Sequence, residues 1–121
     1  MASSDESAIE SVVLDYFEGW FEGDAARMDR ALHEQLSKAS LADEGDSLDR
    51  LSKDFMVDAT ARGVGRTRKA AVGDPRIDVE VVDLYGSIAS VTVRSAVYHE
   101  YLHLVKTTGG WKIANALWQW T

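Results

Sequence analysis

The chain has 121 residues, of which 45% are hydrophobic and 27% charged, and it contains no cysteine. This composition excludes a disordered chain and predicts one domain, residues 1–121, with its own hydrophobic core, while the lack of cysteine excludes disulfides, thiolate nucleophiles and cysteine-ligated metals. The formal net charge of −7 argues against a nucleic-acid partner, because binding phosphates requires a basic surface.

The sequence shows no sign of export or membrane insertion. Residues 1–7 lack the basic start and apolar stretch of a signal peptide. No segment approaches the ~20 consecutive apolar residues that span a bilayer. We therefore expect a cytoplasmic protein with no membrane partner.

Residues 9–21 carry the clearest helical period in the chain. Apolar side chains recur there at intervals of three and four, which predicts a helix with one wide buried stripe. Ser3 or Ser7 offers a capping box at its start, and Gly23 is a natural stop. Asp24 then caps a second, shorter helix, so the two form a hairpin. The stripe consists of Ile9, Val12, Val13, Tyr16, Phe17, Trp20 and Phe21.

The middle of the chain has weaker patterns. Residues 37–46 are typical of a loop, and Asp46 or Ser47 can cap a third helix after it. Gly63 and Gly65 are expected to end that helix. Its predicted inner side consists of Leu48, Leu51, Phe55 and Ala59.

From residue 77 onward the apolar period changes to two, which is typical of β-strands. Segments 77–84 and 88–94 form one predicted hairpin, and segments 101–106 and 111–120 form a second. Helices followed by an antiparallel sheet define an α+β fold.

The second hairpin carries apolar residues on both faces. Tyr101 and Val105 share one side of their strand, while Leu102 and Leu104 share the other. A sheet with one face in water alternates more cleanly, so we expect both faces to be covered. The helices cover one face, and a homodimer through the sheet would cover the other.

Several segments resemble a known family. Residues 14–24, 85–91, 101–106 and 110–118 are similar to the "putative lumazine-binding" and SnoaL-like group of nuclear transport factor 2-like proteins. This resemblance implies a cystatin-like cone, in which N-terminal helices pack in the concavity of a curved antiparallel sheet. It also implies a pocket between them. The superfamily includes ketosteroid isomerase, polyketide cyclases, scytalone dehydratase and association domains, so the fold does not decide the function.

The resemblance also suggests ligand-binding residues. Tyr16 matches the tyrosine with which the isomerases bind a substrate oxygen, His103 occupies the place of their acid, and Trp118 matches a pocket aromatic. Tyr101 lies on the same face as His103, and Trp20 belongs to the first helix's aromatic set; both are secondary candidates. A tyrosine in an apolar stripe and a histidine between two leucines are also compatible with a purely structural role.

A catalytic base is missing where the isomerases have an aspartate, because Ser37-Lys38-Ala39-Ser40 contains no carboxylate. This departure leaves open whether the chain is an enzyme. Other residues in the sequence could act as the general base instead, but carboxylates on helices and strands are mostly solvated. These other residues are Asp54, Asp58, Asp83 and His33.

No metal or cofactor is expected. His99 and His103 would lie ~13 Å apart on a strand, too far to share one ion. Gly63-Val-Gly65 precedes no strand-to-helix crossover of the dinucleotide-binding type. Residues 62–76 are predicted to be a loop, whose bases are either solvated or guide an anionic ligand to the pocket mouth. These bases include Arg62, Arg66, Arg68 and Lys69.

Three functions remain open. The first is a pocket that binds a small cyclic or aromatic carbonyl compound. Space for it would be left because Ala114, Ala116, Trp118 and Trp120 share one face of the last strand, where small side chains lie beside large aromatic ones. The second is a dimeric interaction module whose pocket is filled by its own side chains. The third is an isomerase, cyclase or dehydratase. A cavity of roughly 300 Å³ or more would favour the first.

Overall fold

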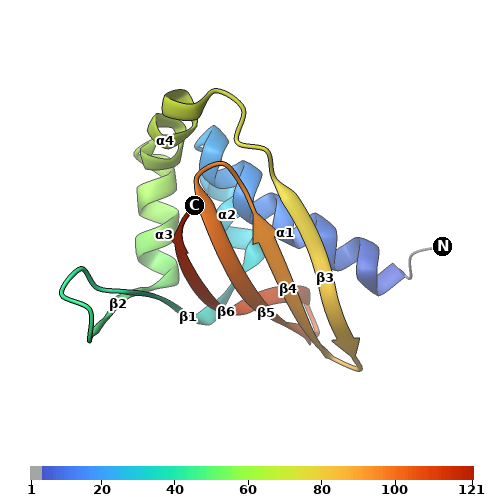
Figure 1. The fold of residues 1–121 in the computed structure, drawn as a ribbon. Helices are drawn as coiled ribbons and strands as arrows, with labels where there is room; N and C mark the ends of the chain where they lie inside the picture. The colour runs from blue at the N-terminus through green and yellow to red at the C-terminus, as the bar shows by residue number, and fades with distance from the viewer. Residues whose placement is uncertain (1–3) are drawn as a thin grey trace.

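The computed structural model describes residues 4–121, which form four helices and a six-stranded sheet. Figure 1 shows the helices on one side of the twisted sheet. In chain order the elements are α1 (Ser4–Glu22), α2 (Ala25–Ala31), β1 (Leu32–Leu41), β2 (Leu48–Leu51), α3 (Lys53–Ala61), α4 (Val64–Val72), β3 (Asp78–Tyr85), β4 (Ile88–Arg94), β5 (Tyr98–Thr107) and β6 (Gly110–Trp120).

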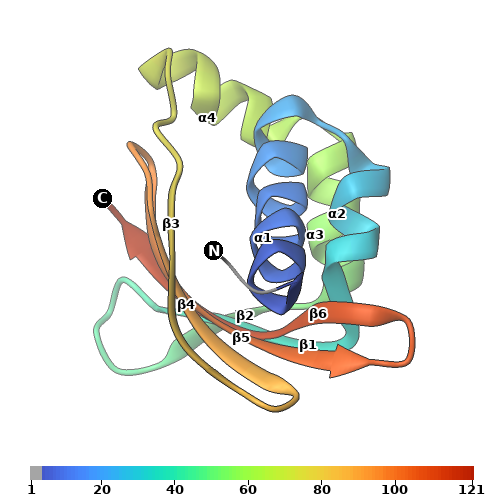
Figure 2. The same ribbon diagram turned by 90° about the vertical axis from the view of Figure 1, so that its right-hand side faces the viewer.

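The sheet has the strand order β2-β1-β6-β5-β4-β3. Neighbours are antiparallel except β1 and β6, which run parallel. Figure 2 shows the sheet curving around α1, with α2 and α3 behind α1 on the same side and α4 near one end. The predicted α+β architecture, with helices in the concavity of a curved sheet, is therefore confirmed.

The first helix has the predicted apolar stripe. Ile9 and Val13 are fully buried, and Phe17 and Phe21 are nearly so, against the inner face of the sheet. Because α1 begins at Ser4, Ser7 lies inside the helix and cannot cap it; the alternative cap, Ser3, lies outside the described residues. At the next helix the prediction is confirmed, since the Asp24 side chain accepts a hydrogen bond from the backbone N–H of Arg27.

The middle of the chain differs from the prediction. Residues 32–41 form β1, which bonds to β2 on one side and to β6 on the other, so the expected loop over 37–46 is wrong for residues 37–41 and confirmed for residues 42–46. The third helix begins at Lys53, where the Ser52 side chain caps the backbone N–H of Phe55. β1 depends on pairing with β6, which is distant in sequence, and the local pattern of β1 does not predict such pairing.

The expected loop over 62–76 contains α4. Gly63 ends α3 with a φ of 82° and starts α4, and Gly65 lies inside the new helix. A Cβ at Gly65 would lie 2.0 Å from the carbonyl oxygen of Trp20, so only glycine allows α4 to approach α1 this closely. The segment was expected to be loop because glycines and bases dominate its composition.

Both predicted hairpins are confirmed, with a bulge in β6. Leu104 pairs with Ile113 and His103 with Asn115, which leaves Ala114 as an extra residue. The bulge changes which residues of β6 face the core. Ala114 lines a shallow depression together with His103, so the expectation that it shares a face with Ala116 is wrong.

No helix within residues 4–121 combines the length and apolar character needed to cross a bilayer.

The contact between Gly65 and Trp20 gives a first prediction. Replacing Gly65 with Ala should lower the free energy of unfolding by about 1 to 3 kcal/mol, because the added methyl group forces α4 away from α1. Chemical denaturation measures this loss. Gly73→Ala is the control at the other end of α4, where a Cβ meets nothing within 4 Å but the φ of 80° is still strained. A loss no larger at Gly65 than at Gly73 would contradict the importance of close packing.

Candidate functional site

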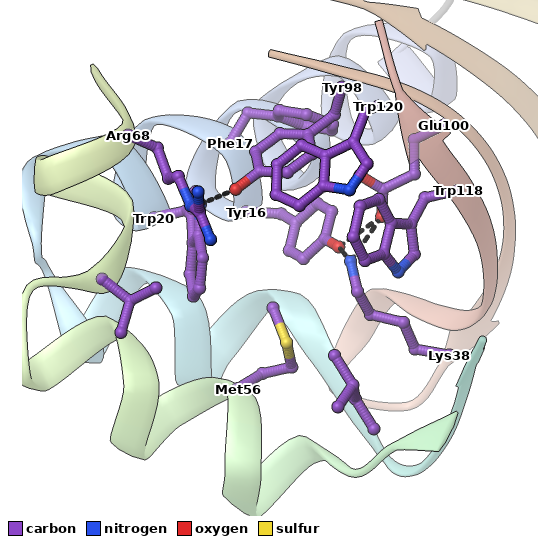
Figure 3. A pocket seen from close by; sticks show the side chains of 12 residues that line it. Tyr16, Phe17, Trp20, Lys38, Met56, Arg68, Tyr98, Glu100, Trp118 and Trp120 are labelled. Atoms are coloured by element: carbon purple, nitrogen blue, oxygen red, sulfur yellow. Dashed lines mark hydrogen bonds and ion pairs between the residues drawn. The ribbon is translucent and has the colours of Figure 1, made fainter. Parts of the chain in front are cut away.

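A cavity of about 180 Å³ lies between the helices and the sheet. Its wall is mostly aromatic and apolar, with three charged side chains that come from β1, α4 and β5. Figure 3 shows these side chains converging on one space from both layers of the fold. The lining consists of Tyr16, Phe17, Trp20, Lys38, Leu51, Met56, Val64, Arg68, Tyr98, Glu100, Trp118 and Trp120.

Three polar side chains meet at the base of the cavity. Lys38 Nζ lies 2.7 Å from Glu100 Oε1, which forms an ion pair between β1 and β5. The Tyr16 hydroxyl of α1 donates a hydrogen bond to the same carboxylate oxygen and accepts one from Lys38. The relative exposure is 3% for Tyr16, 6% for Lys38 and 2% for Glu100, so this polar triad is withdrawn from bulk water.

The triad fixes the protonation of Tyr16. Burial raises the pKa of the Tyr16 hydroxyl well above its usual value, and the negative charge of Glu100 and the hydrogen bond to it raise it further. Tyr16 therefore stays a neutral phenol at physiological pH. Its proton is directed to Glu100, so it is not held ready for a substrate oxygen as in the isomerase pattern.

The polar groups around the triad retain unused hydrogen-bonding capacity. The ammonium group of Lys38 has three donors, and its acceptors among the described residues are the Tyr16 oxygen and Glu100 Oε1. Glu100 Oε2 receives no hydrogen bond from residues 4–121. The indole N–H of Trp118 is buried and has no partner in the same part of the chain. One donor, one acceptor and a further indole donor thus remain for another molecule.

Stacked aromatic rings form one wall of the cavity. The Tyr98 ring lies 5.4 Å from Trp118 in an edge-on contact and 5.3 Å from Trp120 in a stacked one, between ring centroids. The Trp20 indole N–H donates a hydrogen bond of 3.0 Å to the Tyr98 hydroxyl. This bond ties α1 to β5, so the wall is braced from both layers. Rigid rings of this kind suit a flat ligand.

Three predicted ligand-binding residues, Tyr16, Trp20 and Trp118, line the cavity. The other two do not. His103 and Tyr101 are exposed on the outer face of the sheet, so the prediction that they bind a ligand in the same pocket as Tyr16 is wrong. Side chains alternate between the two faces of a strand, so the inward positions of β5 are the even-numbered ones. They are Tyr98, Glu100, Leu102 and Leu104.

Sequence reasoning missed Lys38 and Glu100 as parts of the site, and it named Arg68 only among the bases that could guide an anionic ligand to the pocket mouth. The alternation of Tyr98, Glu100 and Leu102 could have revealed Glu100, because it places a carboxylate among core residues. Lys38 had no such signal, since its segment was predicted to be a loop.

The suggested substitute bases lie away from the cavity. Asp54 and Asp58 are exposed on α3, and Asp83 lines the outer depression. His33 accepts a hydrogen bond at Nδ1 from the backbone N–H of Gln35. Residues 4–121 contain no cluster of metal-ligating side chains.

The buried ion pair gives a second prediction. Lys38→Met and Glu100→Leu should each lower the free energy of unfolding by about 3 to 5 kcal/mol, because either leaves one buried charge without its partner. The double variant should lose far less than the sum, since it leaves no charge behind. Denaturant titrations of the four proteins complete the cycle. Additive losses would contradict the coupling of the two charges.

The sequence profile of a protein family described as "Putative lumazine-binding" matches residues 4–119 of this chain. No curated protein matches the chain in sequence. Solved structures match its fold. A nuclear transport factor 2-like protein of unknown function from Shewanella baltica aligns with a TM-score of 0.76 and 17% identity, over 100% of this chain and 98% of that one.

Two other solved structures have the same architecture. A nuclear transport factor 2-like protein of unknown function from Silicibacter pomeroyi aligns with a TM-score of 0.74 and 17% identity over 100% of both chains. A ketosteroid isomerase-like protein from Erwinia carotovora aligns with a TM-score of 0.60 and 16% identity, over 98% of each chain. At these identities the likeness concerns the fold. The profile match over nearly the whole chain shows that the protein belongs to the "putative lumazine-binding" family, and the solved structures show that it has the fold of nuclear transport factor 2-like proteins.

Proposed function

We propose that the protein binds a small, flat ring compound with a carbonyl group in this cavity. The observation that carries the proposal is the polar triad of Tyr16, Lys38 and Glu100, which lies buried beside open space and retains unused donors and acceptors. A ligand carbonyl would accept from Lys38, and a ring N–H would donate to Glu100 Oε2. The ring would lie against Trp118.

Stability alone does not account for the triad. Withdrawing two charges from water costs several kcal/mol per ion, and well-packed apolar replacements of buried ion pairs are often neutral or stabilising. An ion pair next to a cavity has a second use, because its hydrogen bonds act on a ligand with little competition from water. This supports a role in binding.

The size of the cavity limits the ligand. Its volume of about 180 Å³ is below the roughly 300 Å³ at which sites for drug-sized molecules begin. The cavity is therefore smaller than the volume expected for a pocket that binds a drug-sized ligand, but side chains do not fill it. We infer a ligand of one or two rings without large substituents. Lumazine, which the family's description names, is a two-ring compound with carbonyl and ring N–H groups.

The site favours binding over isomerase chemistry. A general base must be free to reach a substrate proton. Glu100 is the carboxylate in the cavity lining, and its Oε1 is held by both Lys38 and Tyr16. The arrangement therefore orients a ligand better than it removes a proton from one.

Lumazine binding is the third prediction. Titration calorimetry should show binding to the unmodified protein. The double variant Lys38→Met/Glu100→Leu should bind at least tenfold more weakly, a loss of about 1.4 kcal/mol, because it removes both polar anchors and leaves the ring wall in place. Lys112→Met is the matched control, since this lysine donates to the backbone oxygen of Arg30 outside the cavity. Equal affinity of the double variant and the control, or no binding of lumazine at all, would contradict the proposal.

A second function, self-association, is favoured by the outer face of the sheet. Ile88, Tyr101 and Leu117 lie on three neighbouring strands, β4, β5 and β6, and are 60%, 54% and 49% exposed. Tyr101 and Leu117 pair directly, and Ile88 pairs with Val105 on the same face. Exposed apolar side chains that share a face in this way mark interaction surfaces. We propose that two copies of the chain pack through this face. Leu104 belongs to the core at 2% exposure, so a charge there would test the fold and not the interface.

The dimer is the fourth prediction. Tyr101→Glu should convert the dimer to a monomer, because it places an unpaired charge in a desolvated interface. Light scattering at micromolar concentration measures the mass. Phe55→Glu is the control, since Phe55 is an equally exposed aromatic residue on the helical layer, at 46%. An unmodified protein that is already monomeric would contradict the proposal.

A further inference from the structure

Arg68 stands out among the cavity-lining residues because its charge has no partner. Its guanidinium carbon lies 4.7 Å from the centroid of the Trp120 ring, and the side chain reaches the cavity from α4 (Figure 3). No carboxylate of residues 4–121 lies within 4 Å of it. By contrast, Arg27, Arg30 and Arg62 each have a carboxylate oxygen within 2.9 Å. The cavity therefore contains a cation that the protein does not neutralise.

The charges of the lining add up to one positive charge. Lys38 and Glu100 cancel each other, and Tyr16 and Tyr98 are neutral because burial raises the pKa of both hydroxyls. Arg68 is then the remaining charge of the lining. This local excess is notable in a chain whose net charge is −7. A singly charged anion would neutralise the cavity.

The position of Arg68 also suits recognition of a planar anion. A guanidinium stacked on an aromatic ring is held by its face, and its N–H groups along the edge stay available for two parallel hydrogen bonds to a carboxylate or phosphate. Its helix adds to the attraction, since α4 carries Arg66 and Lys69 as well and no acidic residue. The other arginine on α4, Arg66, does not line the cavity.

We infer that the ligand is an anion, a small ring compound whose carboxylate or phosphate group is bound by Arg68 at the cavity wall while its ring lies against the tryptophans. This inference rests on the proposed binding function and names the class of ligand. The ring and the triad provide the apolar and neutral polar contacts, and Arg68 provides the selection for negative charge.

The test compares benzoate with benzamide, which has the same ring and nearly the same shape but no charge. Phenyl phosphate separates the two kinds of anion. The unmodified protein should bind benzoate about tenfold more tightly than benzamide, and the preference should shrink as sodium chloride is raised. Arg68→Gln should remove the preference, because it weakens the binding of benzoate much more than the binding of benzamide. Arg68→Lys should keep part of it, because lysine retains the charge but not the planar fork.

Arg66→Gln is the matched control, because it removes the same charge from the same helix outside the cavity. It should retain the preference for benzoate. If benzamide and benzoate bind equally well to the unmodified protein, or if the variants at 66 and 68 behave alike, the inference is overturned and the binding function stands. If neither compound nor lumazine binds, both the inference and the proposed function fail. A preference for phenyl phosphate over benzoate would assign a phosphate group to the ligand.

Discussion

The carboxylate of Glu100 is the point at which three distant parts of the chain meet. It bonds to Tyr16 from the first helix and to Lys38 from the first strand, residues that are 84 and 62 positions away in sequence. Removing Lys38 would leave the buried carboxylate without its cation, and removing Glu100 would take the acceptor away from both the Lys38 ammonium and the Tyr16 hydroxyl. The angle at which α1 crosses the sheet and the placement of β1 are therefore both coupled to one oxygen atom, and the cavity lies directly beside it.

Two residues of β6, Ala116 and Trp118, lie next to the triad and accommodate it. Lys38 pairs with Ala116 across the parallel contact of β1 and β6, and Glu100 pairs with Trp118 across the contact of β5 and β6. The small side chain of Ala116 leaves space for the long lysine, while the indole of Trp118 lies 5.4 Å from its ammonium group. This contact with an aromatic face adds to the stabilisation of the buried cation. Both residues of β6 thus support the triad, and Trp118 also lines the cavity.

Elements whose contacts are close in sequence could be predicted from the sequence, and elements whose partners are distant could not. The stripe on α1 and the hairpins β3–β4 and β5–β6 depend on neighbours in sequence, and their residues carry the period. β1 depends on β6, which follows it by more than 70 residues, and its local pattern is accordingly weak. His103 was predicted to face the pocket, but the even-numbered residues of β5 point inward, so Glu100 is the inward polar residue. The bulge at Ala114 had no local signal of any kind.

The parallel pairing of β1 with β6 also sets an order of events during synthesis. Lys38 leaves the ribosome long before Glu100 and Ala116 do, and at 5 to 20 residues per second the interval is several seconds. Throughout that time its ammonium group has no carboxylate to bury it with, so β1 stays solvated while the α1–α2 hairpin can already form. β1 can therefore complete its pairing in the sheet only after β5 and β6 have been synthesised. A charge on an unpaired strand disfavours its association with other chains. Replacing Lys38 with an apolar residue would remove that charge from β1 during synthesis, even where it left the finished fold more stable.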